Sequence, residues 1–583
     1  MWRPVLSGLG PPLQGMRRPV LSGLDPPFYR KVGDYPFRVN PSISCAAGHP
    51  GKKLCACLAL RKAGTGSFND LECRQGYGAG AVFTSKTICL KVPCGFPRGI
   101  QIHMPFDILL ALIVGVPVLG SFVLPLAGRI HERLRHSLAF LFVAFSFLAV
   151  IRLSPVVFSG QVVRFSAAMP FGLNLSFTAD GLAVFMALAS LLVGLIIVIY
   201  SFDYISHYAN RNEYDMLVVL FLGSMMGIVF SSNLIFLYIF WEMTSVVSWR
   251  LIGFFRGKTD VQRADKAFLV TFGGALVMLI GFLILYQQTG SFELGVIKEH
   301  FKMQAFPSLA LVLILCGIFS KSATLPFHTW LADAGVAPSP VTALLHAAVL
   351  VKIGVYVFAR LFIATFPIGA VWHVILPWAA AVSSIVSAGA ALRETDLKRI
   401  IAYSTVSQIG FIFFGLSLGV EIAIAGGLLY IFMHGMAKAG LFLCAGIIEQ
   451  GTKTKDISRL GGLFSTMPLT GTAFLFCAAS VMGLPPFGGF FSKFLIFLGC
   501  VQGGQMGLGF VFLFAALMTI LYLLRVFTII FFGETKIAAR EGTPVMVACV
   551  LVLAFLSLAA GIWVRYPLDM VQQATAQMIR VIP

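Results

Sequence analysis

Charged residues are scarce in this sequence of 583 residues. They make up 11% of it, whereas hydrophobic residues make up 58%. Soluble domains carry about 25% charged residues. A soluble protein of this composition would have too little polar surface for water to solvate, so a bilayer is the solvent that fits. The composition therefore predicts an all-α polytopic membrane protein.

Motifs for a resident redox group or metal ion are also missing. None of the 11 cysteines forms a C-x-x-C pair, and Cys55 and Cys57 are too close together for an ordinary zinc or cluster framework. The sequence contains no flavin or haem motif and no carboxylate-rich cage for a cation. We therefore expect no cofactor and no bound metal. Whether the chain belongs to an enzyme then depends on partner subunits.

The first 103 residues differ from the rest. They hold 14 Lys or Arg against 4 Asp or Glu, and the segment from Arg3 to Leu9 recurs from Arg18 to Leu24. Two interpretations are open: a disordered extension, or translated upstream sequence ahead of a true start at Met104. Residues 104–583 are expected to form the transmembrane domain. A basic excess in such a protein is typical of loops on the cytoplasmic side and not of nucleic-acid binding.

Apolar stretches long enough to cross a bilayer, about 20 residues each, recur from Asp107 onward. Pro326 ends one of them, and Pro485-Pro486 interrupts another, so we expect broken helices in the seventh and twelfth spans. A helix broken beside an ionisable residue is a common design for an ion site near the midplane. The fourteen expected spans are 107–127, 136–153, 179–201, 214–230, 233–254, 267–287, 307–325, 337–361, 370–391, 400–419, 423–447, 468–500, 506–532 and 545–565.

Seven ionisable residues interrupt these apolar stretches. A charge at the bilayer centre costs roughly 2.5–3.5 kcal/mol, so a residue kept there is a functional candidate by default. Lysine and histidine exchange protons, which favours H+ as the moving ion without excluding Na+. The seven candidates for a proton pathway are Glu242, Lys321, His346, Lys352, His434, Lys438 and Lys493.

Lys321 has no oppositely charged residue nearby in the sequence. We expect Glu242, on another helix, to be its partner, either in a proton switch or in a static ion pair. Ser492-Lys493, beside the second break, resembles Ser320-Lys321 beside the first. This similarity indicates an internal duplication in which each half contributes a lysine.

Two further pairs combine histidine with lysine. His434 and Lys438 share one helix face and would repel each other if both were charged, which favours proton transfer over fixed charge. His346 either relays protons, since histidine titrates near neutral pH, or is a hydrogen-bonded core residue. Lys352 either accompanies it or extends its side chain toward a helix end.

The remaining charges are interpreted as structural or as loop charge. Asp180, Asp203 and Asp333 lie near expected helix ends. Two basic clusters should face the cytoplasm by the positive-inside rule. These clusters are Arg256, Lys258, Arg263 and Lys266 after the fifth span, and Arg393, Lys398 and Arg399 after the ninth.

Five segments carry a resemblance to a known family. They are FWEMTS at 240–245, SKSATLPFHTWLADA at 320–334, APSPVTALLHAA at 337–348, TDLKRIIAYSTVSQIG at 395–410 and HGMAKA at 434–439. In these segments the sequence resembles the antiporter-like subunits shared by respiratory complex I, membrane-bound hydrogenases and Mrp-type Na+/H+ antiporters. The resemblance extends over roughly residues 104–566.

The resemblance implies about fourteen transmembrane helices with two inverted five-helix repeats, broken helices seven and twelve, and a polar line near the midplane. Two departures affect the expected proton route. The stretch 270–275 lacks an aspartate that some complex I members carry, and Tyr430 stands where some members have a second histidine. By motif, the family positions on helices five, seven, eight, eleven and twelve fall on Glu242, Lys321, His346 with Lys352, His434 with Lys438, and Lys493.

Three functions follow from this resemblance. The leading one is a proton-translocating subunit of a complex I-like or membrane-bound hydrogenase assembly, driven by redox partners. The alternatives are a subunit of an Mrp-type Na+/H+ antiporter and a scaffold subunit with an inactive pathway. In each case we expect other membrane subunits, the lipid bilayer and protons as partners, no nucleic acid, and a multi-pass location in a bacterial or archaeal inner membrane.

Overall fold

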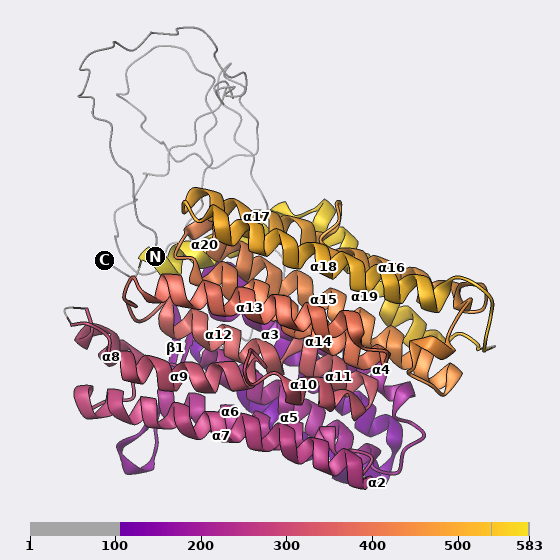
Figure 1. Cartoon of the computed structure of the whole chain (residues 1–583). Coiled ribbons are helices and arrows are strands. Elements are labelled where there is room, and N and C mark those ends of the chain that lie inside the picture. Colours follow the sequence, from indigo (N-terminus) through magenta and orange to yellow (C-terminus); the bar gives the residue numbers. More distant parts are fainter. Residues whose placement is uncertain (1–104, 303, 538, 581–583) are drawn as a thin grey trace, which may run out of the picture. The chain divides into compact units, whose positions relative to one another are not determined.

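A computed structural model describes residues 105–302, 304–537 and 539–580. The two interpretations of residues 1–103 concern residues outside this part of the chain. The described residues form helices and one hairpin, β1 (Val163–Ala168) paired with β2 (Asn174–Ala179). Figure 1 shows the helices running alongside one another. The expected helical membrane fold is confirmed.

The helices end where polar groups or glycines can satisfy the free backbone. Asp180, Asn233 and Asp396 each accept a backbone N–H from the first turn of the helix that follows, as N-cap residues do. In chain order the helices are α1 (Phe106–Ser121), α2 (Leu124–Ile130), α3 (Glu132–Phe158), α4 (Gly181–Tyr204), α5 (Arg211–Phe230), α6 (Leu234–Ile252), α7 (Lys258–Thr289), α8 (Leu294–His300), α9 (Ser308–Lys321), α10 (Thr329–Asp333), α11 (Ser339–Ala343), α12 (Leu350–Phe362), α13 (Trp372–Arg393), α14 (Leu397–Ser417), α15 (Glu421–Thr452), α16 (Pro468–Met482), α17 (Gly488–Gln502), α18 (Met506–Phe531), α19 (Pro544–Ile562) and α20 (Arg565–Arg580).

The number of spans differs from the expected fourteen. Within the described residues, 11 helical segments are long and apolar enough to cross a membrane, or 12 spans if α1 and α2, bent by 49°, count as one. The count of fourteen is therefore not confirmed. The difference lies in α9, α16 and α17, which are apolar but only 14 or 15 residues long. These are the helices that flank the two expected breaks.

Both breaks are present, and a third interruption was not expected. The chain leaves the helix after Lys321 and again after Met482, and helices resume at Thr329 and Gly488. The expected continuous helix at 337–361 is instead divided by a π-helical turn, η3 (Leu344–Ala348). Such turns often occur at functional sites, and this one contains a candidate residue, His346.

Two matching loop pairs support the internal duplication. Isolated bridges join Asn233 to Glu293 and Asp396 to Asp456. Each bridge lies between the start of one helix and the chain that follows a helix of 32 residues, α7 in the first case and α15 in the second. The offset in sequence from the start of α6 to the start of α14 equals the offset from the start of α7 to the start of α15. Because α14 is the fifth crossing after α6 when each interrupted span counts once, the second set runs in the opposite direction, as in an inverted repeat.

The two Ser–Lys pairs do not occupy equivalent places in these repeats. Lys321 lies in the last turn of α9, before its break, whereas Lys493 lies in α17, after its break. The Ser–Lys similarity was therefore misleading in detail, and the loop pairs support the duplication instead.

The two basic clusters lie on one side of the protein. Asp333 accepts from Lys266 at 2.6 Å and from Arg399 at 2.9 Å. These ion pairs join the start of α7 to the start of α14. Asp333 therefore contacts both basic clusters, and the two basic loops share a side, as the positive-inside rule predicts.

Candidate functional site

Lys321 is fully buried at the end of α9, beside the first break. Its ammonium group donates to the Trp241 carbonyl oxygen at 3.1 Å and to the Ser245 hydroxyl at 2.7 Å. The ammonium nitrogen also lies 5.4 Å from the centre of the Trp241 ring, a favourable distance for a cation near an aromatic face. One turn of α6 thus supplies the polar contacts of this lysine.

Glu242 lies in the same turn of α6. Its two carboxylate oxygens are buried, and the carboxyl group lies near the side chains of Ser245 and Tyr238. The carboxylate interacts electrostatically with Lys321. The expected pairing is therefore present as a neighbouring charge, while the direct hydrogen bonds of Lys321 go to Trp241 and Ser245.

The centre of the site holds His346, Lys352 and His434, all buried. The π turn η3 carries His346, whose ring centre lies 4.4 Å from that of Phe442. None of the nitrogen atoms of these three side chains has a hydrogen-bond partner among the described residues. A buried polar group without a fixed partner is costly, which singles these positions out. Because Lys352 is 2% exposed, it does not extend to a helix end.

Close helix packing joins Lys321 to this centre. Gly354 on α12 lies against Ser322, and a Cβ built on Gly354 would be 2.0 Å from the Ser322 hydroxyl oxygen. Lys352 is two residues from this contact. Its ammonium nitrogen lies 3.3 Å from the Cβ position of Gly435, the residue after His434. Lys352 therefore lies between the first break and α15.

Lys438 and Lys493 complete the set. Lys438 donates to the Ile401 carbonyl oxygen at 3.1 Å and to the Ser404 hydroxyl at 2.6 Å. Lys493 donates at 2.8 Å to the carbonyl oxygen of Val481, in the last turn of α16, where the helix dipole favours a cation. His434 interacts electrostatically with both lysines, and also with Lys352 and His346.

A group of polar residues near Lys438 and Lys493 was not predicted from the sequence. Ser404, Gln408, Thr519 and Tyr522 are buried inside apolar helices, as is Tyr430, which the family resemblance marked only as a departure. The predicted site rested on ionisable residues alone. Buried hydroxyl and amide groups at i, i+4 spacing on α14 were the signal available in the sequence.

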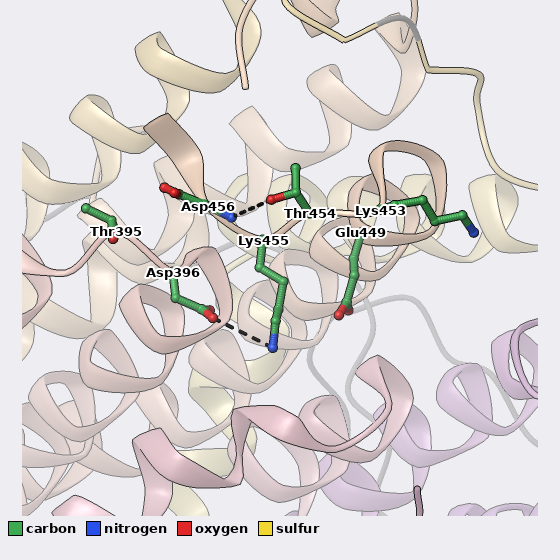
Figure 2. A pocket seen from close by; sticks show the side chains of 7 residues that line it. All are labelled: Thr395, Asp396, Glu449, Lys453, Thr454, Lys455 and Asp456. Atoms are coloured by element: carbon green, nitrogen blue, oxygen red, sulfur yellow. Dashed lines mark hydrogen bonds and ion pairs between the residues drawn. The ribbon is translucent and has the colours of Figure 1, made fainter. Parts of the chain in front are cut away.

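A cavity lined by charged residues lies elsewhere. It measures about 400 Å³ and opens beside the loop pair that joins Asp396 to Asp456. Figure 2 shows Lys455 directed toward Asp396, with 3.7 Å between their charged atoms. Glu449 also lines the cavity, and it forms an ion pair with the buried Lys398 at 2.5 Å. Glu449 follows Lys438 by three turns of α15, roughly 16 Å at 1.5 Å per residue, so the cavity is separate from the buried lysines.

The described residues contain no cluster of three or more His, Cys, Asp or Glu that could hold a metal ion. The buried ionisable side chains instead come one by one from several helices, and three of them, Lys321, Lys438 and Lys493, donate to hydroxyl or carbonyl groups. Chemically, such a set can accept, hold and release protons.

Comparison with known proteins gives two family matches. Residues 165–214 match the family described as NADH-Ubiquinone oxidoreductase (complex I), chain 5 N-terminus. Residues 231–519 match the family described as NADH:quinone oxidoreductase/Mrp antiporter, TM. All seven candidate residues fall within the second match.

Individual relatives agree with these matches. The chain is 37% identical over 421 residues to a Na(+)/H(+) antiporter subunit of Alkalihalophilus pseudofirmus, covering 67% of this chain and 52% of that protein. It is 32% identical to a Na(+)/H(+) antiporter subunit of Staphylococcus aureus, covering 78% of this chain and 61% of that one. The chain thus spans about half to three fifths of the length of these relatives. A solved Mrp complex from Dietzia sp. DQ12-45-1b contains a chain of the same fold, with a TM-score of 0.75, 23% identity and coverage of 82% of this chain and 100% of that one.

Proposed function

The chain belongs to the family of antiporter-like membrane subunits found in complex I and in Mrp antiporters, and we propose that it carries protons across a bilayer as one subunit of an Mrp-type cation/proton antiporter. The sequence alone placed a complex I-like or hydrogenase-like assembly first. The names of the two relatives favour the Mrp-type alternative, which we adopt. Its partners would be further membrane subunits.

One observation carries the proposal: buried lysines and histidines from α9, η3, α12, α15 and α17 gather in one apolar interior. Placing four lysines there has no value for stability alone, because each burial carries a desolvation cost. The groups are also near enough to interact electrostatically. Coupled groups of like charge cannot all be protonated together, so a proton that arrives at one favours release from another.

The first half of the pathway rests on Lys321 and Glu242. A nearby carboxylate favours the charged lysine, and a retreating one favours proton release. Ser245 and the Trp241 carbonyl hold the ammonium group of Lys321 in place. A small movement of Glu242 would therefore change the charge state of Lys321 without moving this lysine. The proton would then pass to His346 and Lys352, whose nitrogens have no fixed partner.

The second half leads through His434 and Lys438 to Lys493. His434 is close to all the other groups of the centre, and Lys493 lies beside the second break. In the assembled complex, a cation would move in the opposite direction to the protons.

Everted membrane vesicles test this function. Vesicles from cells that produce the chain with its partner subunits are energised by respiration, and a pH-sensitive dye reports proton movement on addition of Na+ or K+. Lys321→Ala should reduce the cation-dependent signal by about 100-fold or more, the scale of a lost proton-transfer group. Lys302→Ala, which changes a partly exposed lysine outside the set, serves as the matched control.

Three results would argue against the proposal. Undiminished transport with assembled Lys321→Ala complex would remove Lys321 from the pathway. Proton movement that needs a quinone or another redox substrate, and not a cation, would favour the complex I-like alternative. Absence of any proton movement in the wild-type complex would favour a scaffold role.

A further inference from the structure

A continuous set of hydrogen bonds runs from Lys438 to the neighbourhood of Lys493 without passing through His434. Lys438 donates to Ser404 at 2.6 Å, and the Ser404 and Tyr522 hydroxyls lie 2.8 Å apart. The Gln408 side-chain N–H donates to Tyr522 at 3.1 Å. On its other side, Gln408 accepts a hydrogen bond from Tyr430 at 2.6 Å.

Tyr430 brings this set of bonds to Lys493. The Tyr430 ring centre is 5.7 Å from the Lys493 ammonium nitrogen. The Tyr430 hydroxyl and the ammonium group also share one acceptor, the Val481 carbonyl oxygen, at 3.4 and 2.8 Å. The side chains of Ser404, Tyr522, Gln408 and Tyr430 are all fully buried.

Gln408 differs chemically from the other members of the set. A hydroxyl can accept a proton on one side while it donates one on the other, so serine and tyrosine can pass protons along. A neutral amide has donors on nitrogen and an acceptor on oxygen, and it cannot exchange these roles without becoming the unstable imidic acid. The second N–H of Gln408 donates to Thr519 at 3.2 Å. Every bond of the amide is therefore committed, and its orientation is set.

The first repeat provides a contrast at the same position. When α6 and α14 are aligned from their first residues, Ser245 and Gln408 occupy equivalent positions in the two repeats. Ser245 is a hydroxyl in direct contact with Lys321, so nothing at that position prevents proton exchange. In the second repeat an amide thus stands between hydroxyl groups: Ser404 and Tyr522 lie on the Lys438 side, and Tyr430, which shares the Val481 carbonyl acceptor with Lys493, lies on the other.

We propose that Gln408 is a positioning residue that holds Tyr522 and Tyr430 while preventing direct proton passage between Lys438 and Lys493. Protons then cross this stretch by way of His434, whose ring lies on the same helix face as Tyr430 and Lys438. This inference rests on the proposed proton transport. It goes further by assigning an insulating role to a side chain that does not titrate.

The test restores a blocked pathway. His434→Gln removes the titratable ring and should lower cation-dependent proton transport by about 100-fold. Adding Gln408→Glu places a group of the same shape, able to gain and lose a proton, between the two tyrosines. This double variant should recover transport to within about tenfold of wild type. Adding Gln408→Met, of similar length but unable to carry a proton, should recover nothing.

Controls separate this inference from the proposed function and from failed assembly. Gln505→Glu, the same change outside the set, should not restore transport in the His434→Gln background. His434→Ala serves as a second background, and the yield of assembled complex is measured for every variant. An assembled Gln408→Glu, His434→Gln complex without recovery would overturn the inference, as would full transport in both His434 variants. Full transport in Lys321→Ala would instead contradict the proposed function, whatever the Gln408 variants do.

Discussion

The hydrogen bond between Ser245 and Lys321 leads to a quantitative prediction. The ammonium group donates to this hydroxyl at 2.7 Å, and both residues are fully buried. A hydrogen bond to a charged group contributes about 1.5–3 kcal/mol. Ser245→Ala removes the acceptor and keeps the backbone, so the protonated form of Lys321 should lose about that much stabilisation. At 1.36 kcal/mol per pH unit, the pH dependence of transport should move to lower pH by about 1 to 2 units.

The assay is the pH profile of cation-dependent proton transport in vesicles that contain the assembled complex. Ser248→Ala is the matched control. Ser248 lies one turn further along α6, is also buried, and donates to the Ser245 carbonyl oxygen without contacting Lys321. Its profile should coincide with that of wild type. A Ser245→Ala complex with an unchanged profile would refute the reasoning, because the hydroxyl would then contribute nothing to the charge of Lys321.

Two other predictions concern stability. Asp180 accepts two hydrogen bonds from the buried guanidinium of Arg360, so Asp180→Asn should lower the free energy of unfolding by about 3–5 kcal/mol, seen as a lower thermal midpoint in detergent. Burial raises the pKa of the Asp180 carboxyl, but Arg360 lowers it below its usual range. The stability that this pair contributes is therefore present at neutral pH and lost as the pH falls through the folded-state pKa of Asp180. The Asn variant should not show this loss of stability at acid pH. Gly354→Ala would place a Cβ 2.0 Å from the Ser322 hydroxyl oxygen and should lower the free energy of unfolding by about 1–3 kcal/mol. Gly273→Ala is the control: there is open space around the new methyl group, so the thermal midpoint should stay unchanged or rise.

Sequence patterns predicted the broken spans well because their causes are local. Pro326 and the pair Pro485-Pro486 cannot continue a helix, and the structure breaks the helices there. The π turn at His346 left no such mark, because no proline or glycine interrupts residues 341–352 and the neighbouring helices decide whether an extra residue is accommodated.

Predictions about which groups contact each ionisable side chain were less successful. Opposite charge made Glu242 the expected partner of Lys321, yet the direct hydrogen bonds go to a backbone carbonyl and to Ser245. A backbone carbonyl carries no sequence signal. Similarly, the Ser–Lys resemblance suggested a duplication that the loop pairs support, although the two lysines lie on opposite sides of their breaks.

The sequence by itself determined that this protein lies in a membrane, which family it belongs to, and which helices carry ionisable residues. These conclusions depend on hydropathy and on motifs, which are local properties of the chain. Only the tertiary structure decided which groups each ionisable residue meets. Ser404 and Tyr522 are 118 positions apart, so the packing of α14 against α18 is what brings their hydroxyls together. The same packing places the amide of Gln408 between two lysines.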